Sequence, residues 1–281
     1  MKIGLIDVDS HNFPNIALMK VSSYYKFYGN DVEHAMMGFY DKVYASKIFK
    51  FSQDFDLPMV DYGEIHKGGT GYCISSKLPD EIDVCNPDYS IYPQYDFSVQ
   101  FFSRGCIRNC AFCVVREKEG YIHPVKPMNL NPKGNHIEVL DNNFFANPEW
   151  REAVQYLLKV GQPINLHGVD VRIMDEEQAY WLNKLKHCKQ IHIAWDFPKL
   201  NLIPQIKEMT KHIKPYKIMC YVLIGFNSTP EEDLYRVEKL RELGVDPFVM
   251  PFNKSNKYQK KFARWVNHKA IFKTVKWEDY R

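Results

Sequence analysis

The run Phe97-Ser-Val-Gln-Phe-Phe-Ser103 is followed, after Arg104 and Gly105, by Cys106-Ile-Arg-Asn-Cys110-Ala-Phe-Cys113. The first part has the aromatic and β-branched composition of a buried strand. The second part places three cysteines on one short loop, where three thiolates can converge on a single metal centre. Arg104, Arg108 and Asn109 make this loop too polar to be core. We therefore expect the cysteines to bind a metal rather than to fill space.

The number of ligands distinguishes the metals that such a loop can hold. Thiolate sulfur selects iron–sulfur clusters, zinc or cuprous ions. A structural zinc ion takes four ligands, and the fourth would have to be His123 or a distant cysteine. Three cysteines on a four-iron cluster leave one iron open to a small molecule. We therefore expect a 4Fe-4S cluster on Cys106, Cys110 and Cys113, with zinc as the alternative.

Strand-like runs recur along the chain beyond the cysteines, and the later runs end 26 to 29 residues apart, which is the length of one β/α unit. Helix-start signals lie between them, at Asn147-Pro148, at Asp175 with Gln178, and at Thr229-Pro-Glu-Glu232. Six such units fall short of the eight that close a barrel. The expected fold is α/β, with a partial (β/α)6 TIM-like barrel over residues 97–252. The strand runs end at Ser103, Asp141, Asp170, Asp196, Gly225 and Phe252.

Residues 1–76 predict a separate and smaller α/β domain. Residues 2–8 look like a buried strand, and residues 15–28 like a helix that ends at Gly29. Short strand-like runs follow at 31–35, 42–45 and 59–65, which together suggest a small doubly wound sheet. Residues 77–96 contain Pro79, Pro87 and Pro93 and have the composition of a linker.

Residues 253–281 form a basic and aromatic C-terminal extension. They carry nine Lys and Arg against two Asp and Glu, whereas the first 252 residues carry 28 against 32. We expect a terminal helix and loop whose aromatic side chains pack on the body while the lysines stay in water. Contact with nucleic acid or another polyanion is the alternative.

The rest of the composition indicates a globular protein of the cytoplasm. Asp7 and Asp9 interrupt the apolar N-terminus before it resembles an export signal. The longest nearly apolar stretch, Ile218 to Phe226, is shorter than the ~20 residues that cross a bilayer, so no membrane contact is expected. Seven cysteines without an export signal are expected to stay reduced.

The cysteine array, placed after the first strand of a β/α repeat and with Phe112 directly before the third cysteine, resembles the radical S-adenosylmethionine superfamily. The resemblance covers roughly residues 97–252 and is most specific at the cysteines. It implies that the open iron chelates S-adenosylmethionine, and that one electron then cleaves the sulfonium to give methionine and a 5′-deoxyadenosyl radical. It also implies an electron donor such as a flavodoxin or ferredoxin. The substrate stays open, with RNA, a peptide and a small molecule as candidates.

The resemblance also implies contacts to S-adenosylmethionine at the ends of later strands. Asn142 and Asn143 stand where the family often has a Gly-Gly-Glu-like segment, so their amides would contact the methionine amino group. His167 or Asp170 would face the ribose. The segment Val222-Leu-Ile-Gly225 resembles the one that lies beside adenine. For Cys220 and Tyr221 we expect buried packing, with hydrogen-atom donation to a product radical as the alternative.

The first domain resembles the cobalamin-binding domain that precedes the barrel in one branch of this superfamily. Asp9-Ser-His11, Ser46-Lys-Ile48 and Gly68-Gly69 fall roughly where that fold has its conserved elements, but Pro14 lies near a position that needs glycine. We expect the doubly wound shape without cobalamin. Three functions follow: radical hydrogen abstraction with no second cofactor, cobalamin-dependent radical methyl transfer, or a non-catalytic iron–sulfur protein that transfers electrons or senses oxidation.

Overall fold

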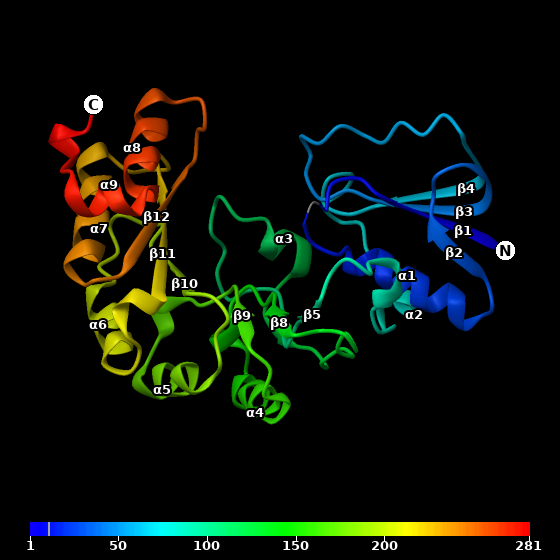
Figure 1. The fold of residues 1–281 in the computed structure, drawn as a ribbon, viewed down its shortest axis with the longest axis horizontal. Helices are drawn as coiled ribbons and strands as arrows, with labels where there is room; N and C mark the ends of the chain where they lie inside the picture. Colours follow the sequence, from blue (N-terminus) through cyan, green and yellow to red (C-terminus); the bar gives the residue numbers. More distant parts are fainter. Residues whose placement is uncertain (11) are drawn as a thin grey trace. The chain divides into compact units, whose positions relative to one another are not determined.

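A computed structural model describes residues 1–10 and 12–281 of the chain (Figure 1). It divides into an N-terminal unit, made of Met1–Gln100, Arg108–Tyr121 and Lys126–Asn135, and a C-terminal unit, made of Phe101–Ile107, Ile122–Val125 and His136–Arg281. Both units combine helices with parallel strands, which confirms the α/β class. Among the described residues, no helix is both long enough and apolar enough to span a bilayer.

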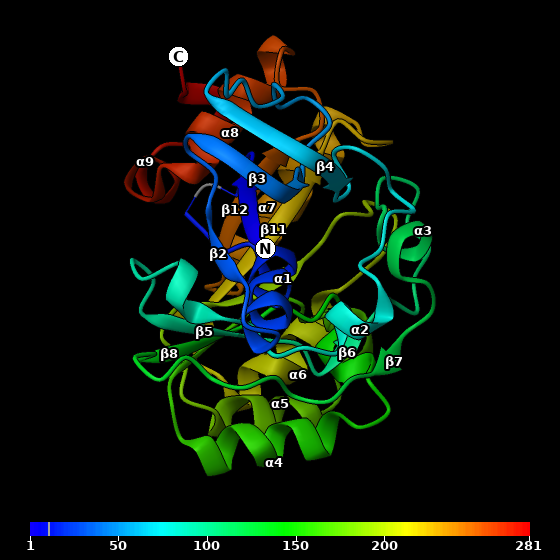
Figure 2. The same ribbon diagram turned by 90° about the vertical axis from the view of Figure 1, so that its right-hand side faces the viewer.

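The N-terminal unit is built on a parallel sheet with strand order β2-β1-β3-β4. Its strands are β1 (Lys2–Asp7), β2 (Asp31–His34), β3 (Gly38–Ser46) and β4 (Val60–Gly68). Helix α1 (Ile16–Phe27) lies on one face of this sheet (Figure 2). The predicted strands and helix are therefore present, and β3 is longer than the run predicted for it.

The two faces of this sheet are covered differently. On one face, Ile3 and Leu5 pack with Leu18 and Val21 of α1. On the other face, the cluster of Ile6, Tyr40, Val43 and Val60 packs against loop side chains, Phe55, Leu57 and Tyr72 among them. Residues 47–59, which connect β3 to β4, form no helix. The second helical layer of a doubly wound sheet is thus replaced by apolar loop residues in this part of the described chain.

The segment predicted as a linker is folded onto the N-terminal unit. It forms the short helix α2 (Asp80–Asp83) and the 3-10 turn η1 (Tyr89–Ile91), and Ile82 joins the core beneath α1. Asp88 accepts hydrogen bonds from Ser22 Oγ and Lys26 Nζ, both at 2.7 Å. The prolines of this segment separate short turns, and the side chains between them bind the sheet and helix. Strand β5 (Phe97–Gln100) and helix α3 (Val115–Glu119) complete this unit.

The C-terminal unit alternates strands and helices as the spacing predicts. Strand β8 pairs in parallel with β9, and β11 lies in parallel between β10 and β12, while β6 and β7 form a short antiparallel pair. The strands are β6 (Ser103–Arg104), β7 (His123–Pro124), β8 (His136–Val139), β9 (Ile164–Leu166), β10 (Ile191–Ala194), β11 (Ile218–Ile224) and β12 (Asp246–Pro251). The helices are α4 (Trp150–Val160), α5 (Glu176–Lys184), α6 (Ile203–His212) and α7 (Pro230–Glu242), with 3-10 turns η2 (Phe144–Ala146), η3 (Val171–Ile173) and η4 (Pro215–Lys217).

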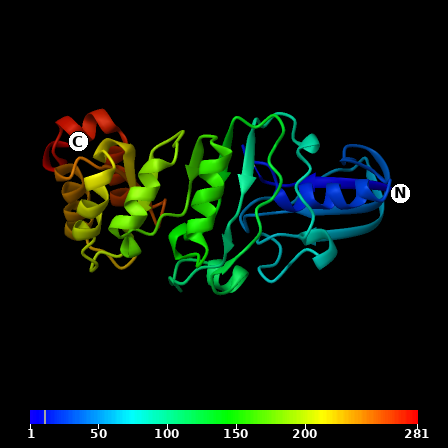
Figure 3. The same cartoon turned by 90° about the horizontal axis from the view of Figure 1, so that it is seen from below.

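The sheets of the C-terminal unit have one helix-covered face and one more open face. Helices α4 and α5 lie together on one side of β8, β9 and β10 (Figure 1), and they stand in front of the strands when seen from below (Figure 3). Along β11, buried residues such as Cys220 and Val222 alternate with half-exposed residues such as Tyr221. Parallel partners point to the same side of a sheet. We call the side that carries Glu138, Asn165, His192, Tyr221 and Phe248 the inner face.

The C-terminal extension is packed through its aromatic side chains. In α8 (Lys257–Asn267) and α9 (Lys269–Thr274), Phe262, Trp265 and Phe272 are buried. The ring of Trp277, in η5 (Trp277–Asp279), lies 5.0 Å from that of Phe262 and 5.4 Å from that of Trp265. The expected packing on the body is confirmed, so these buried rings are not available to stack on bases. Lys257, Lys260, Lys261 and Arg264 stay exposed.

Arg236 of α7 ties its helix to two strand ends. Its side chain is completely buried, and Nη1 donates to the carbonyl of Trp195 at 2.7 Å. Nη2 donates to the carbonyl of Leu223 at 3.0 Å and to Asp233 Oδ1 at 2.6 Å. A buried guanidinium is stable only when its charge and its donors are matched in this way.

Arg236→Met is expected to lower the free energy of unfolding by about 3–5 kcal/mol, because it leaves the Asp233 carboxylate buried without a counter-charge. Urea denaturation at neutral pH measures the change. Lys239→Met is the matched control, since Lys239 lies on the same helix in an exposed pair with Glu242 and should cost less than about 1 kcal/mol. Equal stability of the two variants would contradict the role of Arg236.

Candidate functional site

The three cysteines of the predicted metal loop form no disulfide within the described residues. Cys106 is half-buried and follows Gly105, whose φ of +78° lets the chain turn sharply after β6. Cys110 and Cys113 belong to the N-terminal unit, where the amide of Cys113 donates to the carbonyl of Cys110 at 2.9 Å. Cysteine thiolates are the ligand type that an iron–sulfur cluster takes. In residues 1–10 and 12–281, no three His, Cys, Asp or Glu side chains are already gathered as a metal site.

A buried carboxylate anchors the chain just before Cys106. Asp141, beyond the end of β8, is 1% exposed and accepts from the amide of Phe102 at 2.9 Å and from Ser103 Oγ at 2.5 Å. Asn147 Nδ2 donates to the carbonyl of Phe102 at 3.0 Å. The backbone that leads into β6 is therefore held at both polar groups of Phe102, its amide and its carbonyl. Burial raises the pKa of Asp141 to about 6, although these hydrogen bonds oppose the shift.

Sequence reasoning missed this anchor and misplaced one helix cap. Asn147, predicted to start a helix, has its amide on Phe102, and helix α4 begins later, at Trp150. The anchor could be identified only by knowing that the end of β8, which carries Asp141, lies next to Ser103. The spacing of residues along the sequence does not show which strands are neighbours.

Asn143 and Asp170, both predicted to contact the cofactor, are brought together. Asn143 is 1% exposed and its Nδ2 donates to Asp170 Oδ2 at 3.1 Å. Asp170 also accepts from Arg172 Nε at 2.6 Å and Nη2 at 3.0 Å. The Oδ1 atom of Asn143 is buried and has no hydrogen-bond partner among the described residues. An orphaned buried carbonyl oxygen of this kind suits a ligand that donates N–H. Asn142, the neighbouring candidate, is half-buried.

The rim at these strand ends extends to β10. Burial raises the pKa of Asp196, and the charges of Arg172 and Arg236 act against that shift. The guanidinium of Arg172 also lies 6.0 Å from the ring centre of Phe197. Arg172, which sequence reasoning did not single out, is therefore the cation that the acidic residues of the rim share.

Gly225 has a structural role that is visible in its surroundings. Its φ is +74°, and a Cβ atom added there would lie 1.9 Å from Gln259 Nε2 of α8. Gln259 Oε1 accepts from the amide of Asn253 at 2.8 Å, so the amide side chain is fixed. The close packing against Gln259 is therefore sufficient by itself to require glycine at position 225. A contact between this segment and adenine stays a prediction.

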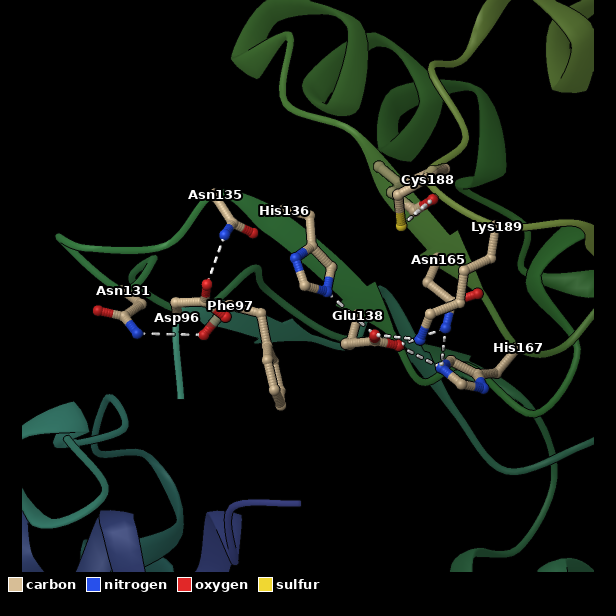
Figure 4. Close-up of polar contacts among 11 residues, drawn as sticks. Asp96, Phe97, Asn131, Asn135, His136, Glu138, Asn165, His167, Cys188 and Lys189 are labelled. Atoms are coloured by element: carbon tan, nitrogen blue, oxygen red, sulfur yellow. Dashed lines mark hydrogen bonds and ion pairs between the residues drawn. The ribbon is translucent and has the colours of Figure 1, made fainter. Parts of the chain in front are cut away.

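His167, the third predicted contact, belongs to a polar cluster on the inner face (Figure 4). Its Nε2 lies 2.5 Å from Glu138 Oε2, which also accepts from Asn165 Nδ2 at 2.7 Å. His136 Nε2 and Lys189 Nζ lie 3.1 Å and 3.4 Å from the other carboxylate oxygen. Burial alone would raise the pKa of Glu138, but the hydrogen bonds and the charges of His167 and Lys189 outweigh it and lower the pKa to about 2.

Sequence reasoning did not identify Glu138. The sequence signal for it is a charged residue in the strand His-Ile-Glu-Val, opposite Asn165 in the next strand.

Two further residues singled out in the sequence are Phe112 and Cys220. Phe112 is half-buried, and Cys220 is completely buried, with a pKa that burial raises. The burial of Cys220 agrees with the expected packing, whereas Tyr221 is half-exposed and differs from it.

The elements that resemble a cobalamin site converge in the N-terminal unit, but they are bonded to one another. Asp9 accepts from the amides of Ile48 at 2.7 Å and Phe49 at 2.8 Å. A Cβ atom at Gly69 would lie 2.3 Å from the carbonyl oxygen of Lys47, so the open side of this glycine is filled by the chain itself. These residues do not fit cobalamin. His11, the histidine of the Asp9-Ser-His11 element, lies outside the described residues.

The raised pKa of Asp141 predicts a specific pH dependence. Between about pH 4 and pH 6 the folded state binds more protons than the unfolded state, so the free energy of unfolding should fall as the pH rises, by up to about 3 kcal/mol. Asp141→Asn should abolish this part of the dependence, because it has no proton to lose and still offers an acceptor to Phe102. Denaturation of both proteins across this range measures the difference.

Asp141→Ala is the companion variant. It leaves the amide of Phe102 and the hydroxyl of Ser103 buried without an acceptor, and it should cost about 2–4 kcal/mol at neutral pH. If Asp141→Asn and wild type respond to pH identically, the carboxylate does not titrate as described.

No protein-family model matches the chain, and no curated protein matches it either. Within the C-terminal unit, the candidate residues are Cys106 with the anchor at Asp141, the rim around Asp170 and the inner-face cluster around Glu138.

Proposed function

We propose that the chain is a radical S-adenosylmethionine enzyme that holds a 4Fe-4S cluster on Cys106, Cys110 and Cys113. The observation that carries the proposal is the C-x3-C-x2-C loop, whose cysteines form no disulfide within the described residues and whose start is fixed by the hydrogen bonds of Asp141 to Phe102 and Ser103. When bound, the cluster would supply the electron that cleaves S-adenosylmethionine to methionine and a 5′-deoxyadenosyl radical. An electron donor such as a flavodoxin or ferredoxin would be a partner.

The chain's own residues would bind and orient the cofactor. Each cysteine would contribute one thiolate, and the loop would close as the thiolates are drawn together, because metal binding and local folding are coupled. The unpaired Oδ1 of Asn143 would accept a hydrogen bond from the methionine ammonium group. Asp170, whose oxygens are occupied by Arg172 and Asn143, would hold that amide in place.

The proposed architecture is the one that such chemistry needs. Residues 97–252 would form a partial (β/α)6 barrel, whose strand ends carry the cysteines, the asparagine amides and the Gly225 segment. Residues 1–76, a parallel sheet with helix α1 on one face, would form a domain without cobalamin, which is supported by the filled space beside Gly69. Hydrogen abstraction without a second cofactor is therefore the reaction class that we favour over cobalamin-dependent methyl transfer.

Anaerobic reconstitution with iron and sulfide, followed by reductant and S-adenosylmethionine, tests the proposal. Wild type should bind iron and form 5′-deoxyadenosine, and Cys110→Ala should form none above background, because two thiolates no longer retain the cluster. Cys85→Ala is the matched control: this half-buried thiol of the N-terminal unit makes one hydrogen bond, to the carbonyl of Glu81.

Each outcome has a definite meaning. Equal 5′-deoxyadenosine from wild type and Cys110→Ala would remove the mechanism. An iron–sulfur spectrum that does not respond to S-adenosylmethionine would indicate a non-catalytic electron carrier instead.

A further inference from the structure

The inner face of the C-terminal unit carries an ionised carboxylate that none of the proposed cofactor contacts uses. The Glu138 side chain is 4% exposed, yet its pKa is lowered to about 2, so it is charged at neutral pH. Its oxygens face His167, Asn165, His136 and Lys189 (Figure 4). A buried charge needs such partners, but two of them, His167 and Lys189, are themselves largely accessible.

The imidazole of His167 is oriented by this carboxylate. Its Nε2 lies next to Glu138 Oε2, and its side chain is 40% exposed. A ring nitrogen 2.5 Å from an ionised carboxylate carries a proton, which leaves the opposite nitrogen, Nδ1, as the basic one. A carboxylate that fixes the tautomer of an accessible imidazole is the arrangement of a general base.

Other polar side chains lie beside His167 on the inner face. The ring of His192 on β10 lies 6.4 Å from that of His167, and the ring of Tyr221 on β11 lies 5.3 Å from that of His192. The Nδ1 atom of His192 is buried without a hydrogen-bond partner among the described residues. Burial, and then the charges of His167 and Lys189, lower the pKa of His192, which keeps its ring neutral. Beyond Tyr221, Phe248 and Met250 of β12 present exposed apolar surface.

We infer that Glu138 and His167 form a proton-transfer pair for a substrate that presents a hydroxyl or amino group to His167 and His192 and an apolar body to Phe248. The inference rests on the proposed function and names the substrate class of that site. In the step itself, the bond between the proton and the substrate oxygen or nitrogen breaks, and its electron pair stays on that atom. The proton moves to His167 Nδ1, and Glu138 stabilises the imidazolium that forms. No electron is gained or lost, so no further reactant is needed.

Nuclear magnetic resonance of the protein without its cluster, labelled with 15N at histidine, tests the pair independently of catalysis. His167 in its neutral form should carry its proton on Nε2, with Nδ1 unprotonated. The probe 2-amino-1-phenylethanol, which has a hydroxyl, an amino group and a ring, should then shift the 15N signals of His167 and His192. An Nδ1-protonated His167, or no shift at any probe concentration, would overturn the inference.

Variants separate this role from folding. Glu138→Gln and His167→Asn should each weaken probe binding about tenfold, the effect of one lost hydrogen bond to a polar group. His268→Asn is the matched control, because asparagine also caps α9, and it should bind the probe as wild type does. His167→Asn removes no buried group, so it keeps the test valid if Glu138→Gln does not fold.

Binding of S-adenosylmethionine to the reconstituted protein distinguishes this inference from a cofactor contact. His167→Asn should leave that affinity within about twofold, whereas Asn143→Ala should weaken it about tenfold. If His167→Asn weakens cofactor binding as much as Asn143→Ala, His167 faces the ribose and the inference is wrong. Failure of the proposed function appears separately, as loss of 5′-deoxyadenosine formation in wild type.

Discussion

The cysteine loop depends on one buried carboxylate. Asp141 reaches from the end of β8 to the backbone amide of Phe102 and the hydroxyl of Ser103, and Asn147 holds the carbonyl of the same phenylalanine. A carboxylate buried to this degree is destabilised by desolvation, which is why its pKa is raised rather than lowered. The fold tolerates this cost three residues before Cys106, which would supply the first thiolate of the proposed cluster.

The C-terminal unit uses its two sheet faces for different purposes. The helix-covered face is closed by apolar residues and by the buried Arg236–Asp233 pair, which joins α7 to the ends of β10 and β11. The inner face instead has unpaired polar atoms next to an ionised Glu138. Buried polar groups without a hydrogen-bond partner cost free energy when no ligand is bound. Their concentration on one face therefore indicates where a bound ligand would stabilise the protein most.

Much of the fold was predictable because its signals are local. The capping boxes at Asp175 with Gln178 and at Thr229 with Glu232 are both formed, and parallel strands occupy the predicted runs. The failures concern tertiary pairing. Composition suggested a linker where Asp88 and Tyr92 bind the first unit, and a helical layer where loop residues such as Phe55 fill the core. At the site, the cysteines were visible in sequence, whereas the pairing of His167 with Glu138 required knowledge of which strands are neighbours.

Electron paramagnetic resonance can detect the proposed cluster, in which three thiolates hold four irons and the fourth iron binds S-adenosylmethionine. The anaerobically reconstituted, reduced protein should show the signal of a reduced 4Fe-4S cluster, and its g-values should change when S-adenosylmethionine is added. A reduced protein with no cluster signal, or a signal that S-adenosylmethionine leaves unchanged, would contradict the account.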